Sequence, residues 1–197
     1  MAVTNPGYTL GGTWTIEMWV YLNSASSHMS LYHHREDASN DNLIWLHSDG
    51  TLMIDTDEAG QVRWNWGPST STWYHLAICS DSNSATCYVD GSALSLYSGY
   101  DATITGGFPA INANVRIGAR HHADRYLDGY IDDFRVTRGL VVYSGNFTKP
   151  TGALTKTWDS SNLGGYANLT NIASNTDASK VELLLHGDGG VFTDSSP

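Results

Sequence analysis

Apolar and polar residues alternate along most of this chain in short runs. The run GGTWTIEMWVYL at residues 11–22 puts five apolar side chains on one face of a predicted strand, and Glu17, Trp19 and Tyr21 on the other. Because both faces carry bulky residues, this strand is predicted to lie in the middle of a sheet.

The same rhythm continues with turn residues at close intervals. Residues 26–67 read as four strands with a turn at Asp49–Gly50. The segment from residue 73 to 94 adds a hairpin closed around residues 81–84 and a tight turn at Asp90–Gly91. These signals predict an antiparallel meander.

Two further strands are predicted at residues 115–119 and 128–137, joined by a loop that holds His121 and His122. From 155 to 180 the chain is polar with few apolar residues, which predicts a long surface connection before an apolar strand at 181–187. About ten short strands with no helix beyond a turn near 138–143 predict an all-β fold, a two-sheet antiparallel β-sandwich with jelly-roll order.

Composition and charge narrow the function classes. The 197 residues are 41% apolar and only 15% charged, a balance that suits one sandwich domain. The formal net charge of -10 would repel phosphate backbones, so no nucleic acid is expected as a partner. No apolar run is long enough to span a bilayer, so no membrane insertion is expected. The start lacks the layout of a signal peptide, which leaves another export route or a chain that begins inside a longer one.

The two cysteines, Cys79 and Cys87, flank the predicted hairpin loop. A three-residue loop would place their sulfur atoms opposite each other, where a disulfide could close. Two small buried thiols are the alternative.

The order of segments resembles a known family. TIEMWVYL, SDGTL, WYHLAICSDSNSATCYVDG, VRIGA and GYIDDFRVTRGLVVYSGNFTKP follow one another as in the concanavalin A-like, laminin-G-like jelly rolls of bacterial, environmental and phage proteins. The resemblance covers roughly residues 8–154. It implies a concanavalin A-like jelly roll for residues 1–154.

The family usually begins with a segment much like VELLLHGDGGVFTDSSP, which here stands at residues 181–197. One interpretation is a fragment of a tandem array; the other is a permuted chain in which residues 155–197 connect to a strand at 181–187 that completes the same sandwich. Exchange of this strand between chains would give a homo-oligomer.

Two adjacent acids interrupt the strand at 128–137. Asp132 and Asp133 are predicted to point to opposite faces. Related jelly rolls often hold a structural calcium near this strand, which implies Asp132 as a ligand, with Asp188 and Asp194 as further candidates. The alternative is an acid paired with an arginine (Arg116, Arg135 or Arg138) and no metal.

Aromatic residues and histidines supply the candidate ligand-binding set. Aromatic faces can stack on sugar rings, and RWNW at 63–66 would form a platform if Trp64 and Trp66 faced solvent. The competing interpretation is that these rings are core, and that the histidines are loop residues rather than zinc ligands. The candidates are Trp64, Trp66, Tyr32, His33, His121 and His122.

No enzyme is expected. Glycosidases of this fold carry two or three carboxylates along one strand, and the comparable strand here offers only Glu17. The leading hypothesis is a non-catalytic binding module for carbohydrate or a surface polymer, in an extracellular, cell-surface or virion-associated protein. The alternatives are an assembly domain of a phage tail or cell-surface fibre and, third, a glycoside hydrolase.

Overall fold

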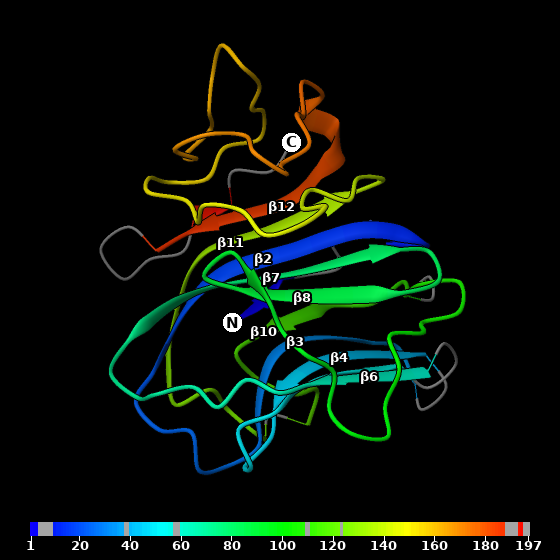
Figure 1. The fold of residues 1–197 in the computed structure, drawn as a ribbon. Helices are drawn as coiled ribbons and strands as arrows, with labels where there is room; N and C mark the ends of the chain where they lie inside the picture. Colours follow the sequence, from blue (N-terminus) through cyan, green and yellow to red (C-terminus); the bar gives the residue numbers. More distant parts are fainter. Residues whose placement is uncertain are drawn as a thin grey trace.

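The computed structural model describes most of the chain, namely residues 1–3, 10–37, 40–56, 60–108, 111–122, 124–187 and 193–194. The described residues form thirteen strands in two antiparallel sheets, drawn in Figure 1. They include no helix long and apolar enough to cross a membrane.

The six-stranded sheet has the following order: β1 (Ala2–Val3), β10 (Val115–Ile117), β3 (Met29–Arg35), β4 (Asp41–Leu46), β5 (Leu52–Thr56) and β6 (Gly60–Trp64). The seven-stranded sheet has the following order: β13 (Thr193–Asp194), β12 (Val181–His186), β11 (Gly129–Arg138), β2 (Thr13–Leu22), β7 (Trp73–Asp81), β8 (Ala85–Val89) and β9 (Ser92–Ala93). The predicted two-sheet antiparallel sandwich, consistent with a jelly roll, is confirmed. The one helical element among the described residues is a 3-10 turn at Ala178–Lys180, not near residues 138–143.

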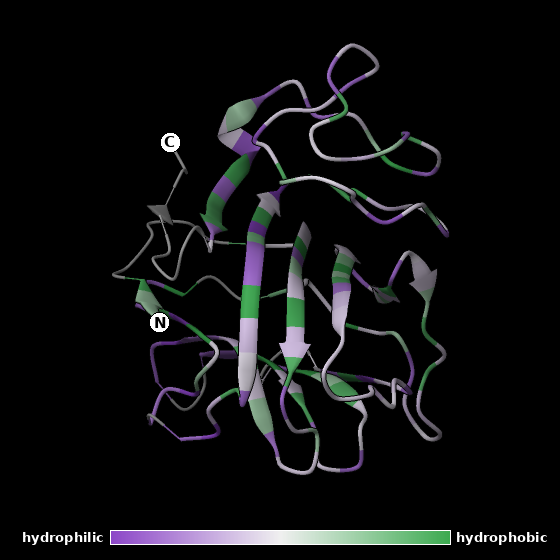
Figure 2. Ribbon diagram, turned by 90° about the vertical axis from the view of Figure 1, so that its left-hand side faces the viewer, coloured by the Kyte–Doolittle hydropathy of each residue, from purple (hydrophilic) through white to green (hydrophobic). Residues whose placement is uncertain are grey.

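The space between the sheets is filled by the apolar face of each strand. On β2 the predicted alternation holds, because all five apolar residues of that face have no exposed area. Figure 2 shows hydrophobic and hydrophilic residues following one another along the strands. The central position predicted for β2 is also observed, between β11 and β7.

The outer face of the seven-stranded sheet carries a second cluster of buried residues. The chain from 139 to 180 runs over this face (Figure 1), and Val142, Leu154, Trp158 and Ile172 pack there against the sheet. Residues 155–180, predicted as a polar surface connection, are therefore anchored by Trp158 and Ile172. Together with residues 139–154 they form the segment that we call the connection. It leads into β12, which pairs antiparallel with β11. The permuted relation to the family stays a prediction.

A β-bulge interrupts β11 at the adjacent acids. Asp132 pairs with Trp19 and Arg135 with Glu17, so β11 has one more residue than β2 between these pairs, and Asp133 adopts φ +47°. The expectation that the two acids point to opposite faces is wrong, since both line one cavity on the outer side of the sheet. The extra residue shifts the alternation by one position.

Cys79 and Cys87 do not form a disulfide; both are free and buried. Cys79 pairs with Thr86 and Cys87 with Ile78, because the hairpin loop has four residues rather than three. The two sulfur atoms therefore point to opposite faces of the sheet. Burial raises the pKa of Cys79 to about 12 and that of Cys87 well above its usual value.

We expect both thiols to be inert in the folded protein. A thiol-reactive dye should label neither cysteine in native buffer and both in denaturant, because only the exposed thiolate reacts. A reducing agent should leave the melting temperature unchanged. Fast labelling without denaturant would contradict the burial of these side chains.

Candidate functional site

An exposed row of aromatic side chains crosses three neighbouring strands of the seven-stranded sheet. Tyr21 on β2 is the direct cross-strand partner of Trp73 on β7 and of Tyr130 on β11. The ring centroids lie 5.5 Å apart for Tyr21 and Trp73, and 5.8 Å for Tyr21 and Tyr130. Trp73 is 40% exposed and Tyr130 is 61% exposed. Strand alternation explains the row, because the neighbours Val20 and Ile131 point inward.

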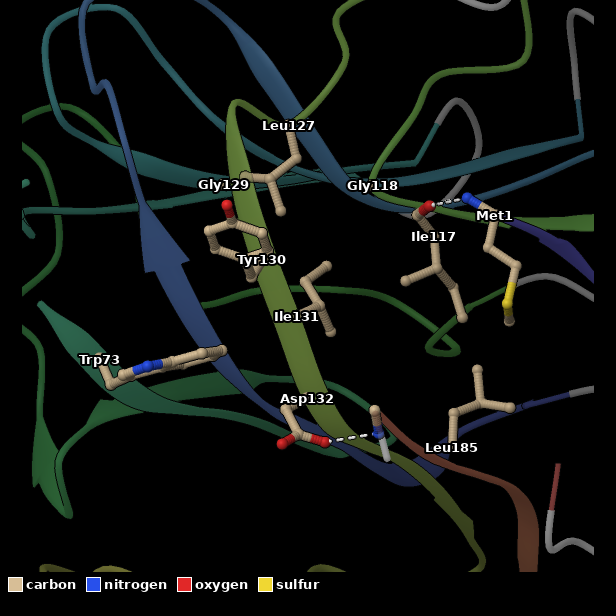
Figure 3. A pocket seen from close by; sticks show the side chains of 11 residues that line it. Met1, Trp73, Ile117, Gly118, Leu127, Gly129, Tyr130, Ile131, Asp132 and Leu185 are labelled. Carbon is tan, nitrogen blue, oxygen red and sulfur yellow. Dashed lines mark hydrogen bonds between the residues drawn. The ribbon is translucent and has the colours of Figure 1, made fainter. Parts of the chain in front are cut away.

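A cavity of about 530 Å³ opens beside this row (Figure 3). Trp73, Tyr130 and Asp132 line it from the seven-stranded sheet, and Ile117 lines it from β10 of the other sheet. Apolar walls with few polar groups are typical of small-molecule sites. Asp132 is therefore the carboxylate available to orient a ligand against these aromatic rings.

A second cavity of about 380 Å³ shares two of these residues. Trp73 and Asp132 line both cavities, and the second is closed by Trp19, Asp133 and the loop at 150–152. The aromatic row and Asp132 thus lie between the two cavities. We call Tyr21, Trp73, Tyr130 and Asp132 the aromatic site.

The adjacent acids hold strand β12 in place. Asp132 Oδ1 accepts hydrogen bonds from the backbone N–H groups of Gly187 and Asp133, each at 2.7 Å. Asp133 pairs with His186 and accepts the Leu154 N–H at 3.2 Å. Burial raises the pKa of Asp133 above its usual value. The partner of the buried acid is thus a histidine, and not one of the three arginines considered from the sequence.

The calcium site stays a prediction. Asp188 lies outside the described residues, and only the backbone pairing of Asp194 with Leu185 is described. Within the described part of the chain, no three His, Cys, Asp or Glu side chains gather as metal ligands would. Asp132 uses Oδ1 for backbone N–H groups, so calcium would have to bind through its other oxygen and groups not described.

Glu17 is sealed beneath the connection. Arg135 donates to its Oε1 at 2.9 Å and 2.5 Å, His75 Nε2 lies 3.2 Å from its Oε2, and the Tyr143 hydroxyl donates to Oε2. Its side chain has no exposed area. Burial would raise the pKa of Glu17, but Arg135, His75 and Tyr143 outweigh burial and lower it to about 2. A carboxylate held in this way is structural.

Three of the predicted aromatic ligands belong to the core. Trp64 is 1% exposed, and Tyr32 is fully buried and stacks against Phe108 and Phe134. Trp66 is half-buried, packs against the core and meets Tyr74 edge-on at 5.5 Å. The platform proposed for Trp64 and Trp66 is therefore wrong, because β6 turns the face of Trp64 toward the other sheet.

The predicted histidines do gather at one place. His33 lies on the outer face of β3, and the loop after β10 brings His121 and His122 beside it, with ring centroids 6.2 Å apart for His33 and His121. His33 Nε2 contacts Asp41 at 2.6 Å, and its Nδ1 accepts the His121 N–H at 2.6 Å. Both ring nitrogens of His33 therefore have partners within the protein. His121 and His122 are the exposed histidines of the group.

Sequence reasoning missed Tyr130 and did not single out Trp73. The signal was present for both, because each alternates with a residue of the core in its own strand. Only the pairing of β7, β2 and β11 brings these rings together, and pairing partners cannot be read from one strand.

Comparisons with known proteins point to one family. Residues 1–141 match the family described as the concanavalin A-like lectin/glucanases superfamily, under the heading Laminin_G_3. None of the curated proteins matches the chain.

Solved structures show the same fold at low identity. A Bacteroides ovatus protein described as carbohydrate binding has a TM-score of 0.59 at 15% identity, over 98% of this chain and 52% of its own. Domains LG4-5 of the mouse laminin alpha1 chain have a TM-score of 0.53 at 15% identity. This match covers 68% of our chain and 37% of the laminin chain. Domain 4 of AbnA has a TM-score of 0.51 at 20% identity, and the match covers 68% of our chain and 65% of that domain's chain. AbnA is an extracellular GH43 arabinanase from Geobacillus stearothermophilus, and the structure is a complex with arabinotriose. The chain thus spans less than two thirds of the length of each of these three neighbours.

Proposed function

This chain belongs to the concanavalin A-like lectin/glucanase superfamily, and from that premise we propose that it is a non-catalytic carbohydrate-binding module. Two of the structural neighbours support this proposal: one is proposed to bind carbohydrate, and the other was solved in complex with arabinotriose. We propose that it acts outside the cell or at the cell surface, and the arabinanase neighbour, which is described as extracellular, supports this location.

The observation that carries the proposal is the aromatic site. Trp73 and Tyr130 are exposed beside a cavity, and flat apolar rings of this kind can stack on the C–H faces of sugar rings. Asp132 stands at the same cavity and can accept hydrogen bonds from sugar hydroxyl groups. Stacking supplies most of the affinity in this arrangement, and the carboxylate sets the orientation.

The acids of this chain support binding over hydrolysis. A glycosidase needs two carboxyl groups about 5 to 10 Å apart on either side of the scissile bond. Glu17 is buried under Arg135 and Tyr143 and cannot meet a substrate. Asp133 lines the second cavity beside Asp132, but His186 and the Leu154 N–H occupy its carboxylate, which leaves Asp132 as the acid that can meet a ligand at both cavities.

Removal of one ring should weaken binding strongly. We expect Trp73→Ala to lower the affinity for a glycan identified on an array roughly five- to thirty-fold, because loss of one stacked ring removes about 1 to 2 kcal/mol. Tyr130→Ala should have a similar effect. Calorimetry measures both, with Tyr100→Ala as the matched control, since Tyr100 lines neither cavity of the aromatic site.

The same array separates the alternatives. The array is run once with calcium and once with a chelator, on the parent and on Asp132→Asn. Binding that needs calcium and is abolished in Asp132→Asn would support a calcium site at Asp132. A silent array together with self-association in sedimentation would instead support an assembly domain of a fibre or phage tail. Unchanged affinity in both ring variants would reject the aromatic site.

A further inference from the structure

The outer face of the six-stranded sheet gathers positive charge in a chain with a net charge of -10. Three arginines lie on this face by strand register, since Arg116 is paired with His33, Arg63 with Met53, and Arg35 follows His33 by two residues. Two more come from the loop between β10 and β11. Five of the seven arginines of the chain thus belong to this face: Arg35, Arg63, Arg116, Arg120 and Arg125.

A cavity of about 200 Å³ lies among them. Its polar lining consists of three guanidinium groups, one indole and two carboxylates, from Arg35, Arg120, Arg125, Trp45, Asp41 and Asp55. We call it the arginine cavity. It has no lining residue in common with the aromatic site, which belongs to the other sheet.

The charges of the arginine cavity are not balanced internally. Arg35 and Asp41 form an ion pair at 2.7 Å, and Asp55 accepts a hydrogen bond from Gln61 at 2.8 Å. Three guanidinium groups face two carboxylates, which leaves one positive charge in excess. A group with a single negative charge would restore the balance.

Several donors of this cavity lack an acceptor. Arg120 Nε, Arg125 Nη1 and Trp45 Nε1 are buried, and none has a hydrogen-bond partner among the described residues. A buried N–H group without an acceptor costs about 1 to 3 kcal/mol, and more where the group is charged. These three residues therefore provide donors that a bound oxyanion could satisfy.

Arg125 is held in a costly backbone conformation. Its φ is +49°, in the left-handed region that residues other than glycine rarely adopt. Its guanidinium lies 4.5 Å from the centre of the Trp45 ring, and its carbonyl accepts the Ser30 N–H at 2.9 Å. The fold thus fixes this side chain over the cavity, and strain of this kind is found at binding sites.

We propose that the arginine cavity binds the carboxylate or sulfate group of an acidic sugar. Guanidinium groups match the planar carboxylate and the oxygens of sulfate with paired N–H donors. The small volume accepts the charged substituent of one sugar rather than an oligosaccharide. The net charge of the chain disfavours a polyphosphate ligand. That the anion is carried by a sugar rests on the proposed function, whereas recognition of the anion rests on the arginine cavity alone.

NMR titration tests this site directly. The probes are D-glucuronate and D-glucose 6-sulfate, with D-glucose as the neutral counterpart. We expect one or both acidic probes to shift the Arg120 Nε–H and Trp45 Nε1–H signals in a saturable way, and glucose to leave them unchanged. The probe that binds more tightly identifies the charged group. The signals lie on the opposite sheet from Trp73, so failure of the aromatic site would leave this titration unaffected.

Variants decide between specific and general charge effects. Arg120→Gln should lower the affinity for the acidic probe at least ten-fold. Asp55→Asn should raise this affinity, because it removes a negative charge that repels the anion. Arg138→Gln is the matched control, since Arg138 is an exposed arginine of the other sheet paired with Glu182. Equal weakening by Arg120→Gln and Arg138→Gln, or no shift with either acidic probe, would overturn the proposal, provided that the melting temperatures of the variants are retained.

Discussion

Arg135→Ala is expected to destabilise the protein by about 3–5 kcal/mol, because it leaves a buried carboxylate without its counter-charge. Arg135 has no exposed area and donates to Glu17, to the Thr155 carbonyl at 2.7 Å and to the Tyr166 hydroxyl. Its guanidinium also lies 4.0 Å from the centre of the Trp158 ring. One side chain thus joins β2, β11 and the connection that covers them.

Chemical denaturation measures this loss, and a second arginine of the same strand provides the control. Arg138 pairs with Glu182 at 2.5 Å but its side chain is 49% exposed. Arg138→Ala should therefore change the free energy of unfolding by no more than about 1 kcal/mol. Similar losses in the two variants would mean that the buried network adds no more than a surface ion pair.

The buried network also shows what the sequence can and cannot predict. Alternation along β2 identifies the core face correctly, because strand geometry alone decides which residues share a face. The other face of β2 is also buried at Thr15 and Glu17, and nothing local to Glu17 indicates it. Tyr143, Trp158 and Tyr166 cover Glu17, and all three lie in the connection, more than a hundred residues away along the chain.

The candidate site was harder to predict than the fold for a related reason. Trp64 and Trp73 are equally aromatic in the sequence, but β6 turns Trp64 into the sandwich whereas Trp73 begins β7 on the outer face. Which face of a strand meets the second sheet depends on the sheet that the strand joins. The arginine cavity likewise depends on a loop that brings Arg120 to its wall and Arg125 over the Trp45 ring.

Glu17 makes the stability of the protein depend on acid pH. Its pKa in the fold is about 2 against an ordinary value of 4.5, since Arg135 from β11, His75 from β7 and Tyr143 from the connection outweigh the effect of burial. A folded pKa below the unfolded one contributes stability that is complete above pH 4.5 and is lost as the pH falls toward 2. A shift of this size corresponds to about 3 kcal/mol.

Glu17→Gln should therefore be less stable than the parent at pH 7, and the difference should shrink between pH 4.5 and 2. Denaturation at a series of pH values measures it. Asp49 is the matched comparison, because hydrogen bonds from Thr51 and the nearby Arg63 also lower its pKa to about 2, even against the smaller effect of its burial. Its side chain is 49% exposed, so solvent screens the charge and Asp49→Asn should change the pH profile far less. If the two variants followed the same profile, the acid sensitivity of this fold would reside in its surface charges, and the sealed Glu17–Arg135 pair would have no special part in it.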